Sequence, residues 1–272
     1  MPELPEVETT RRGLAACLIG SRIVDVVVRD RRLRWPVPRN LATRVVGRVV
    51  RAVERRGKYL LLDCERGWLI VHLGMSGSLR VLPAHTPAGK HDHVDFMLSN
   101  GYLMRLTDPR RFGTVLWAGD NPMSHPLLRE LAPEPFDEAF DASWLHARIA
   151  RRRAAIKTLL MDSRLVTGVG NIYAAEALFR ARIHPLTPGR RIGPARCQRL
   201  VRAIRDTLLE AISAGGSTLR DFVGSNGAPG YFQQQSFVYG RAGEPCRVCG
   251  APIRAIRQGL RSTFYCPHCQ RP

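Results

Sequence analysis

Four cysteines near the end of the chain form two C-x-x-C pairs, Cys246 with Cys249 and Cys266 with Cys269. Each pair can form a tight knuckle, and two knuckles can place four thiolates around one tetrahedral zinc ion. Two redox pairs are the alternative, but the βαβ pattern typical of such pairs does not surround them. Because four protein ligands leave no open coordination position, we expect one structural Zn²⁺ ion and no zinc-hydrolase chemistry.

The net charge of the chain is strongly positive. Lys and Arg total 42 against 23 Asp and Glu, which gives a formal charge of +19. A solvated basic surface is the alternative explanation, but solubility does not require so large an excess. A polyanion would offset the self-repulsion, and nucleic acid is the polyanion we expect.

Amine chemistry has few candidates, because the chain has only three lysines: Lys58, Lys90 and Lys157.

Composition also excludes several classes of protein. Hydrophobic residues make up 44% of the chain, which is enough for packed cores. The first ten residues contain three glutamates and no apolar signal region, and no apolar run has the length of a membrane span. We therefore expect a cytoplasmic protein that binds no membrane, with cysteines used for metal and not for disulfides. Three scattered cysteines suggest packing only: Cys17, Cys64 and Cys197.

The two halves of the chain differ in their apolar periodicity. Residues 22–118 contain short apolar runs typical of β-strands, separated by Gly, Pro and Asn, and a short helix is expected before them at 6–19. This part predicts a β-sandwich or flattened barrel. After Pro135 the apolar residues recur at helical spacing in three segments: 143–161, 171–182 and 194–214.

These patterns predict an α+β fold with three domains. We expect an N-terminal β-sandwich at residues 1–135, a helical domain at 136–235 and a zinc finger at 236–272. The segments between the two cysteine pairs read as the strands of a β-hairpin.

Residues 155–179 contain a helix pair that could hold phosphate. A short helix is expected to end near Asp162, a turn passes through Gly168–Gly170, and a second helix begins at Asn171. Glycines let the backbone approach a ligand, and a helix N-terminus attracts anions. An ordinary helical hairpin is the alternative. The basic residues beside it favour binding of the DNA backbone: Arg151, Arg152, Arg153 and Lys157.

Several segments, in order over essentially the whole chain, resemble the formamidopyrimidine-DNA glycosylase family. They are PELPEVETTRRGL at 2–14, GKYLL at 57–61, HLGMSGSLR at 72–80, KHDHVD at 90–95, TDPRRFG at 107–113, the helix pair at 155–179, PGYFQQ at 229–234, and the zinc finger with RSTFYC. The resemblance implies a catalytic N-terminal β-sandwich, a helix–two-turns–helix domain and a C-terminal zinc finger, which agrees with the expectations above.

The resemblance also implies a reaction. Members of the family excise oxidised purines, 8-oxoguanine and formamidopyrimidines, from duplex DNA and cleave the strand by β,δ-elimination. The related endonuclease VIII prefers oxidised pyrimidines and typically begins with a Pro-Glu-Gly-Pro-like sequence, whereas this chain has Leu4 in that segment and Phe112 after two arginines. A non-catalytic, zinc-dependent DNA-binding protein is a further alternative, but binding alone needs no unblocked proline.

The catalytic groups are carried over from the family motifs. Pro2 becomes a free secondary amine once Met1 is removed, and it would attack the sugar C1′. Glu3 is implied as the general acid, with Glu6 as a helper in the pocket. Lys58 follows Gly57 at the apparent turn of a hairpin, and the resemblance implies that it is a phosphate contact and proton donor. Arg261 is implied in δ-elimination, where clamping phosphate suits a guanidinium better than proton transfer.

Three side chains match the residues that fill the gap left by a flipped base: Met75, Arg110 and Phe112. Core packing is the alternative for the two apolar residues, but neighbouring glycines suggest exposed loops. The resemblance implies these DNA contacts: His91, Arg110, Arg152, Asn171, Arg261 and, near the pocket, Lys157. The segment 217–232 is expected to close over the flipped base. We expect a monomer acting on duplex DNA.

Overall fold

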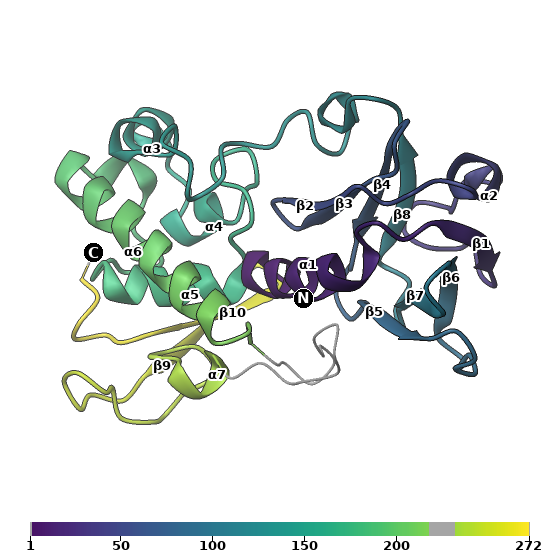
Figure 1. The fold of residues 1–272 in the computed structure, drawn as a ribbon. Helices are drawn as coiled ribbons and strands as arrows, with labels where there is room; N and C mark the ends of the chain where they lie inside the picture. Colours follow the sequence, from purple (N-terminus) through teal and green to yellow (C-terminus); the bar gives the residue numbers. More distant parts are fainter. Residues whose placement is uncertain (1, 218–231, 272) are drawn as a thin grey trace. The chain divides into compact units, whose positions relative to one another are not determined.

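The computed structural model describes residues 2–217 and 232–271, which fall into two compact units (Figure 1). Unit 1 comprises Met1–Arg129 with Ala214–Tyr231, and unit 2 comprises Glu130–Ser213 with Phe232–Pro272. The expected base-closing loop at 217–232 falls almost entirely outside the described residues. The sequence-based domain boundaries at 135/136 and 235/236 stay a prediction.

Unit 1 contains two antiparallel four-stranded sheets. One has the strand order β1-β6-β7-β5 and the other the order β2-β3-β4-β8. Both sheets contribute to one hydrophobic core, in which Leu62 and Val71 pack with Phe96 and Leu106. The strands are β1 (Ile23–Val28), β2 (Ala52–Arg56), β3 (Tyr59–Asp63), β4 (Trp68–His72), β5 (Ser78–Pro83), β6 (Asp92–Leu98), β7 (Tyr102–Thr107) and β8 (Thr114–Ala118). The predicted β-sandwich is confirmed.

Helix α1 (Leu4–Leu18) belongs to the same core, into which it buries Leu14 and Leu18. A capping box begins it, because Glu3 is the N-cap and its backbone N–H donates to Glu6 Oε2 at 2.8 Å. The helix expected at 6–19 is thus present but begins two residues earlier. Its start fixes the backbone beside Pro2. Unit 1 also contains α2 (Leu41–Val45) and a short 3₁₀ helix at Pro122–Ser124.

Unit 2 combines the helices with the zinc finger. Its elements are α3 (Ala142–Ile149), α4 (Ile156–Leu160), α5 (Asn171–Arg180), a 3₁₀ helix at Gly189–Arg191, α6 (Pro194–Ser213), α7 (Phe232–Gln235) and the antiparallel hairpin of β9 (Arg254–Gln258) and β10 (Arg261–Tyr265). The predicted zinc-finger hairpin is confirmed. Within the described part of the chain, no helix is both long and apolar enough to span a membrane.

The helical periodicity at 143–161 does not produce one helix. The chain leaves the helical path between α3 and α4, where Ala155 forms an isolated bridge with Pro188. The backbone N–H of Ile156 donates to Thr187 O at 2.8 Å. These tertiary hydrogen bonds replace the local helical ones, so the segment contains two helices, of which α4 is the short helix expected to end near Asp162.

Helix α5 joins the helical part of unit 2 to the zinc finger. Its residues Ala175 and Phe179 pack in one cluster with Val238 and Ile253. The buried carboxylate of Glu176 accepts the backbone N–H groups of three consecutive residues, Phe237, Val238 and Tyr239, at 2.8, 3.0 and 2.8 Å. A structural change in the zinc finger would therefore act directly on α5 through these contacts.

Candidate functional site

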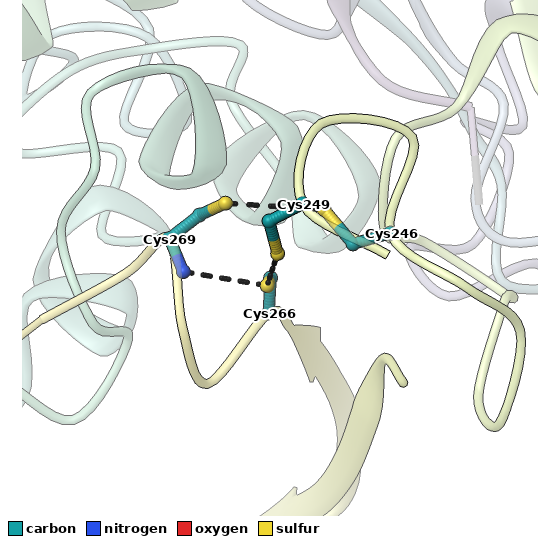
Figure 2. A group of neighbouring side chains, drawn as sticks. All are labelled: Cys246, Cys249, Cys266 and Cys269. Carbon is teal, nitrogen blue, oxygen red and sulfur yellow. Dashed lines mark hydrogen bonds between the residues drawn. The ribbon is translucent and has the colours of Figure 1, made fainter. Parts of the chain in front are cut away.

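The four cysteines of the zinc finger converge on one point, as Figure 2 shows. Their sulfur atoms all lie within 4.8 Å of one another. The Sγ atoms of Cys246 and Cys269 are 3.9 Å apart, and those of Cys249 and Cys266 are 3.5 Å apart. A tetrahedral ion with Zn–S bonds of about 2.3 Å separates its sulfurs by about 3.8 Å. The thiolate set therefore fits a single zinc ion.

Backbone groups orient these sulfurs. The N–H of Val248 donates to Cys246 Sγ at 3.5 Å, and the N–H of Cys269 donates to Cys266 Sγ at 3.3 Å. Such knuckles hold the sulfurs ready for a metal. When bound, the ion would cross-link both knuckles and hold the β9–β10 hairpin against α5.

The predicted nucleophile and general acid lie at the start of α1. Pro2 is buried, and the Glu3 and Glu6 side chains are each 2% exposed. Glu6 does more than cap the helix, because its Oε1 also accepts the backbone N–H of Ser217 at 2.7 Å. It thereby holds the last described residue before segment 218–231 at the start of α1.

Lys58 occupies the turn between β2 and β3, as the sequence predicted. Gly57 precedes it with φ +59°, a conformation that favours glycine. On the neighbouring strand, burial and the positive charges of Lys58 and Arg34 lower the pKa of His72 to about 4. A basic side chain and a neutral imidazole therefore lie at this end of the sheet at neutral pH.

His72 was not singled out by the sequence analysis, although it opens the segment that contains Met75. Its Nδ1 accepts the backbone N–H of Gly74 at 3.0 Å, and its ring lies 4.8 Å from that of Tyr59. The sequence feature that could have pointed to His72 is its position as the first residue of the segment HLGMSGSLR at 72–80. Sequence alone did not show that this histidine orients the loop that follows it.

The predicted gap-filling residues lie on two loops of unit 1. Met75 and Phe112 are each 41% exposed, which is high for apolar side chains and inconsistent with core positions. The Arg110 guanidinium lies 4.8 Å from the centre of the Phe112 ring, in cation–π geometry. Gly74 permits the two loops to touch, since a Cβ there would lie 2.5 Å from the carbonyl carbon of Phe112.

His91, a predicted phosphate contact, is half-buried in the turn before β6. Its carbonyl oxygen accepts the backbone N–H of Asp108 at 2.9 Å. Its loop is thereby tied to the one that carries Arg110 and Phe112.

The predicted phosphate contacts of unit 2 lie around the β9–β10 hairpin. Arg152 and Arg261 are exposed and, with Lys157, line a cavity of about 690 Å³. Asn171 is the first residue of α5, as predicted, and its Nδ2 donates to Ser262 O at 3.1 Å. The structure thus brings the helix pair and the hairpin together within this unit.

Lys157 differs from the other basic residues of this group because its side chain is only 2% exposed. Its Nζ donates to Asn171 Oδ1 at 2.7 Å, to Thr263 Oγ1 at 2.6 Å and to Ser262 O at 3.3 Å. An ammonium has three N–H donors, and these acceptors can use all of them. In this structure Lys157 orients Asn171 and the hairpin from inside the protein.

Comparison with protein families accounts for nearly the whole chain. Residues 1–115 match the formamidopyrimidine-DNA glycosylase N-terminal domain, residues 131–223 match the H2TH domain of the same family, and residues 243–272 match the zinc finger found in FPG and IleRS. Formamidopyrimidine-DNA glycosylase from Cupriavidus pinatubonensis is 59% identical over 286 residues, covering 99% of this chain and 100% of that protein. The Methylococcus capsulatus protein of the same name is 58% identical, with complete coverage of both chains.

Solved structures agree with this assignment. The MutM (Fpg) protein from Thermus thermophilus is 41% identical, covers 99% of this chain and 98% of its own, and superposes with a TM-score of 0.89. Lactococcus lactis Fpg in complex with DNA containing an abasic site is 32% identical, covers 99% of this chain and 100% of its own, and gives a TM-score of 0.92. By sequence and by fold, the chain belongs to the formamidopyrimidine-DNA glycosylase family.

Proposed function

We propose that this enzyme removes oxidised purines from duplex DNA and then cuts the strand, with the amine of Pro2 as its nucleophile. The observation that carries the proposal is the placement of Pro2 and Glu3, buried side by side at the capped start of α1, in a chain 59% identical to a formamidopyrimidine-DNA glycosylase over its whole length. The solved complexes of the Lactococcus lactis protein with DNA holding an abasic site or a modified formamidopyrimidine support the choice of substrate.

The proposed reaction begins after Met1 is removed. A free α-amine has a pKa of about 8, so part of it is neutral near pH 7. Its nitrogen forms a bond to C1′, and the bond from C1′ to the base breaks with the electron pair leaving on the base, which takes up the proton that the attached nitrogen loses. Glu3 then gives a proton to the ring oxygen as the C1′–O4′ bond opens, which leaves an iminium between Pro2 and the sugar.

Strand cleavage follows from the iminium. It acidifies the C2′ proton, and loss of this proton expels the 3′ phosphate; loss of the C4′ proton then expels the 5′ phosphate. Lys58 and Arg261 are proposed to hold the departing phosphates, with Lys58 able to supply a proton. The remaining proposed DNA contacts are His91, Arg110, Arg152, Lys157 and Asn171.

Base flipping requires something to occupy the vacated space in the duplex. Met75 and Phe112 are proposed to enter the stack, and Arg110 to face the orphaned cytosine. Their exposure supports this role.

We also propose that the enzyme acts as a monomer in the cytoplasm, where it reaches DNA.

Borohydride trapping on a duplex with 8-oxoguanine opposite cytosine tests the proposal, with mass mapping of the adduct. We expect the adduct on Pro2. Pro2→Glu should abolish it, because a large second residue retains Met1. Pro36→Glu, the same change at an exposed loop proline, should trap as well as the wild type.

Other outcomes contradict the proposal in distinct ways. An adduct on Lys58 or Lys157 would replace the nucleophile but keep the reaction. Preference for thymine glycol over 8-oxoguanine would favour the endonuclease VIII-like alternative. Tight binding without any adduct would indicate a protein that binds DNA and does not cut it.

A further inference from the structure

Three loops of unit 1 meet at one buried residue, Asp108. The first loop carries Met75, the second carries His91, and the third carries Arg110 and Phe112. Asp108 itself is 0% exposed and lies between β7 and β8, at the start of the third loop.

The carboxylate holds the third loop in shape. Its Oδ2 accepts the backbone N–H of Gly113 at 2.7 Å, and its Oδ1 accepts the backbone N–H of Arg110 at 3.3 Å. The loop also contains Arg111 at φ +56°, a left-handed conformation that costs free energy in a non-glycine residue. Hydrogen bonds at both ends of the turn oppose its relaxation.

The same carboxylate reaches the first loop. Ser76, directly after Met75, is 7% exposed, and its Oγ donates to Asp108 Oδ1 at 3.3 Å. The third loop closes on the first without a gap, since Gly74 lies against the backbone of Phe112.

The main chain of Asp108 reaches the second loop. Its N–H donates to the carbonyl oxygen of His91 at 2.9 Å, and its own carbonyl oxygen accepts from Nε2 of His93 at 2.8 Å. One residue thus contacts all three loops through its two carboxylate oxygens and its backbone N–H, and strand β6 through its carbonyl oxygen.

We propose that Asp108 is a positioning residue for base flipping, which fixes the relative placement of the loops carrying Met75, His91, Arg110 and Phe112. This inference rests on the proposed function, because it assigns those loops to the distorted duplex. Asp108 touches no reacting atom in it. Its carboxylate keeps two apolar side chains exposed at a fixed spacing, which the insertion of both into a base stack demands.

The test compares two substrates under single-turnover conditions: a duplex with 8-oxoguanine opposite cytosine, and the same duplex with a preformed abasic site. Asp108→Asn keeps the size of the side chain but points an amide N–H at a backbone donor. It should slow base excision by roughly 100-fold, the scale of a displacement of about 1 Å at a reacting centre. Cleavage of the abasic site, where no base must leave the stack, should fall by less than about 5-fold.

Two variants separate positioning from folding. Asp120→Asn, the same change at an exposed aspartate of unit 1, should leave both rates unchanged. Ser76→Ala removes only one of the hydrogen bonds to the carboxylate and should shift the ratio of the two rates in the same direction, by roughly 3- to 10-fold. It keeps the inference testable if Asp108→Asn does not fold.

A double-mutant comparison adds a readout that lost stability would not change. Met75→Ala should slow excision strongly in the wild type but little in the Asp108→Asn background, because the side chain is already misplaced there. Equal loss on both substrates, or additive effects with Met75→Ala, would overturn the positioning role. A wild-type protein that cuts neither substrate would instead overturn the proposed function.

Discussion

The two units hold their predicted DNA contacts with buried ions of opposite charge. In unit 1 the central ion is the Asp108 carboxylate, which binds N–H and O–H donors from the loops around it. In unit 2 it is the Lys157 ammonium, which binds oxygen atoms of Asn171, Ser262 and Thr263. In both units several of the side chains proposed to contact DNA lie around the ion and are more exposed than it is.

We infer from this contrast that exposed basic side chains bind DNA and that buried ions position the groups around them. Exposed arginines such as Arg152 and Arg261 are hydrated, and their ion pairs with neighbours would contribute little to stability. A buried ion is different, because removing one partner leaves the other desolvated and unsatisfied. Substitutions of the buried ions should therefore change geometry, and substitutions of the exposed arginines should mainly change affinity.

Removal of the zinc site should have the largest effect on folding and DNA binding. It should affect unit 2 and leave the fold of unit 1 intact. Cys266→Ser is expected to abolish zinc binding and unfold the β9–β10 hairpin, because structural zinc contributes on the order of 10 kcal/mol to folding of isolated fingers. DNA affinity should fall by roughly 100-fold or more, because the hairpin would lose its contacts with DNA and Asn171 would lose its hydrogen bond to Ser262. Metal analysis, binding to an abasic-site duplex and hydrogen exchange would measure the three consequences.

The matched control is Cys17→Ser, a cysteine of unit 1 outside the cluster, which should keep full zinc content. Exchange protection of β3 and β4 should survive Cys266→Ser, because these strands have their own core. Loss of protection throughout both units would instead show that the two fold as one unit.

Lys157→Met should destabilise unit 2 by about 3 kcal/mol, since it removes the ammonium donor to Asn171 Oδ1 and to Oγ1 of the buried Thr263. It should also weaken binding of DNA through misorientation of Asn171. Lys90→Met, at an exposed lysine of unit 1, should change the free energy of unfolding by no more than about 0.5 kcal/mol. Urea denaturation measures both. Similar stability of the two variants would show that Lys157 acts as a DNA contact alone.

What the sequence could predict follows from the range over which each signal acts. The zinc ligands were identifiable because each knuckle is local, two cysteines with two residues between them. The start of α5 at Asn171 was also predictable, because Gly168 and Gly170 interrupt the helical pattern just before it. The turn at Lys58 has the same local origin.

Features set by distant contacts were missed. The break between α3 and α4 depends on Thr187 and Pro188, some thirty positions from the residues they bond. Strand β2 carries three charged residues in five and buries only Val53, so its apolar pattern is weak, and only the hairpin turn predicted at Lys58 indicated it. Asp108 lay within a recognised motif, but its contact with Ser76 spans 32 residues of sequence, and no periodic pattern encodes such a pairing.

A smaller prediction concerns pH, through one histidine in each unit with the same local geometry. His72 Nδ1 accepts the N–H of Gly74, and His184 Nδ1 accepts the N–H of Leu186. Burial lowers the pKa of both, but only His72, beside Lys58 and Arg34, falls to about 4. We therefore expect unit 1 to be the more sensitive to mild acid.

The sign follows from proton binding. Between about pH 6.5 and pH 4 the unfolded chain binds a proton at His72 that the folded chain does not, so the free energy of unfolding falls as pH falls through this window. From pH 7 to pH 5 the loss should be about 2 kcal/mol. Between pH 7 and pH 5 the carboxylate of Glu8 contributes little, because its pKa is about 4.5 in the unfolded chain and about 2 in the folded one, so its effect falls mainly below pH 5.

His72→Asn keeps an acceptor for the N–H of Gly74 and removes the titration, so it should flatten this pH dependence for unit 1. His184→Asn should flatten that of unit 2 by a smaller amount. Urea denaturation at pH 7 and pH 5, with hydrogen exchange read separately in β3–β4 and in α5, distinguishes the units. An unchanged slope in His72→Asn would mean that folding does not lower the pKa of this imidazole; it would then be protonated at pH 5, where its Nδ1 could not accept the N–H of Gly74.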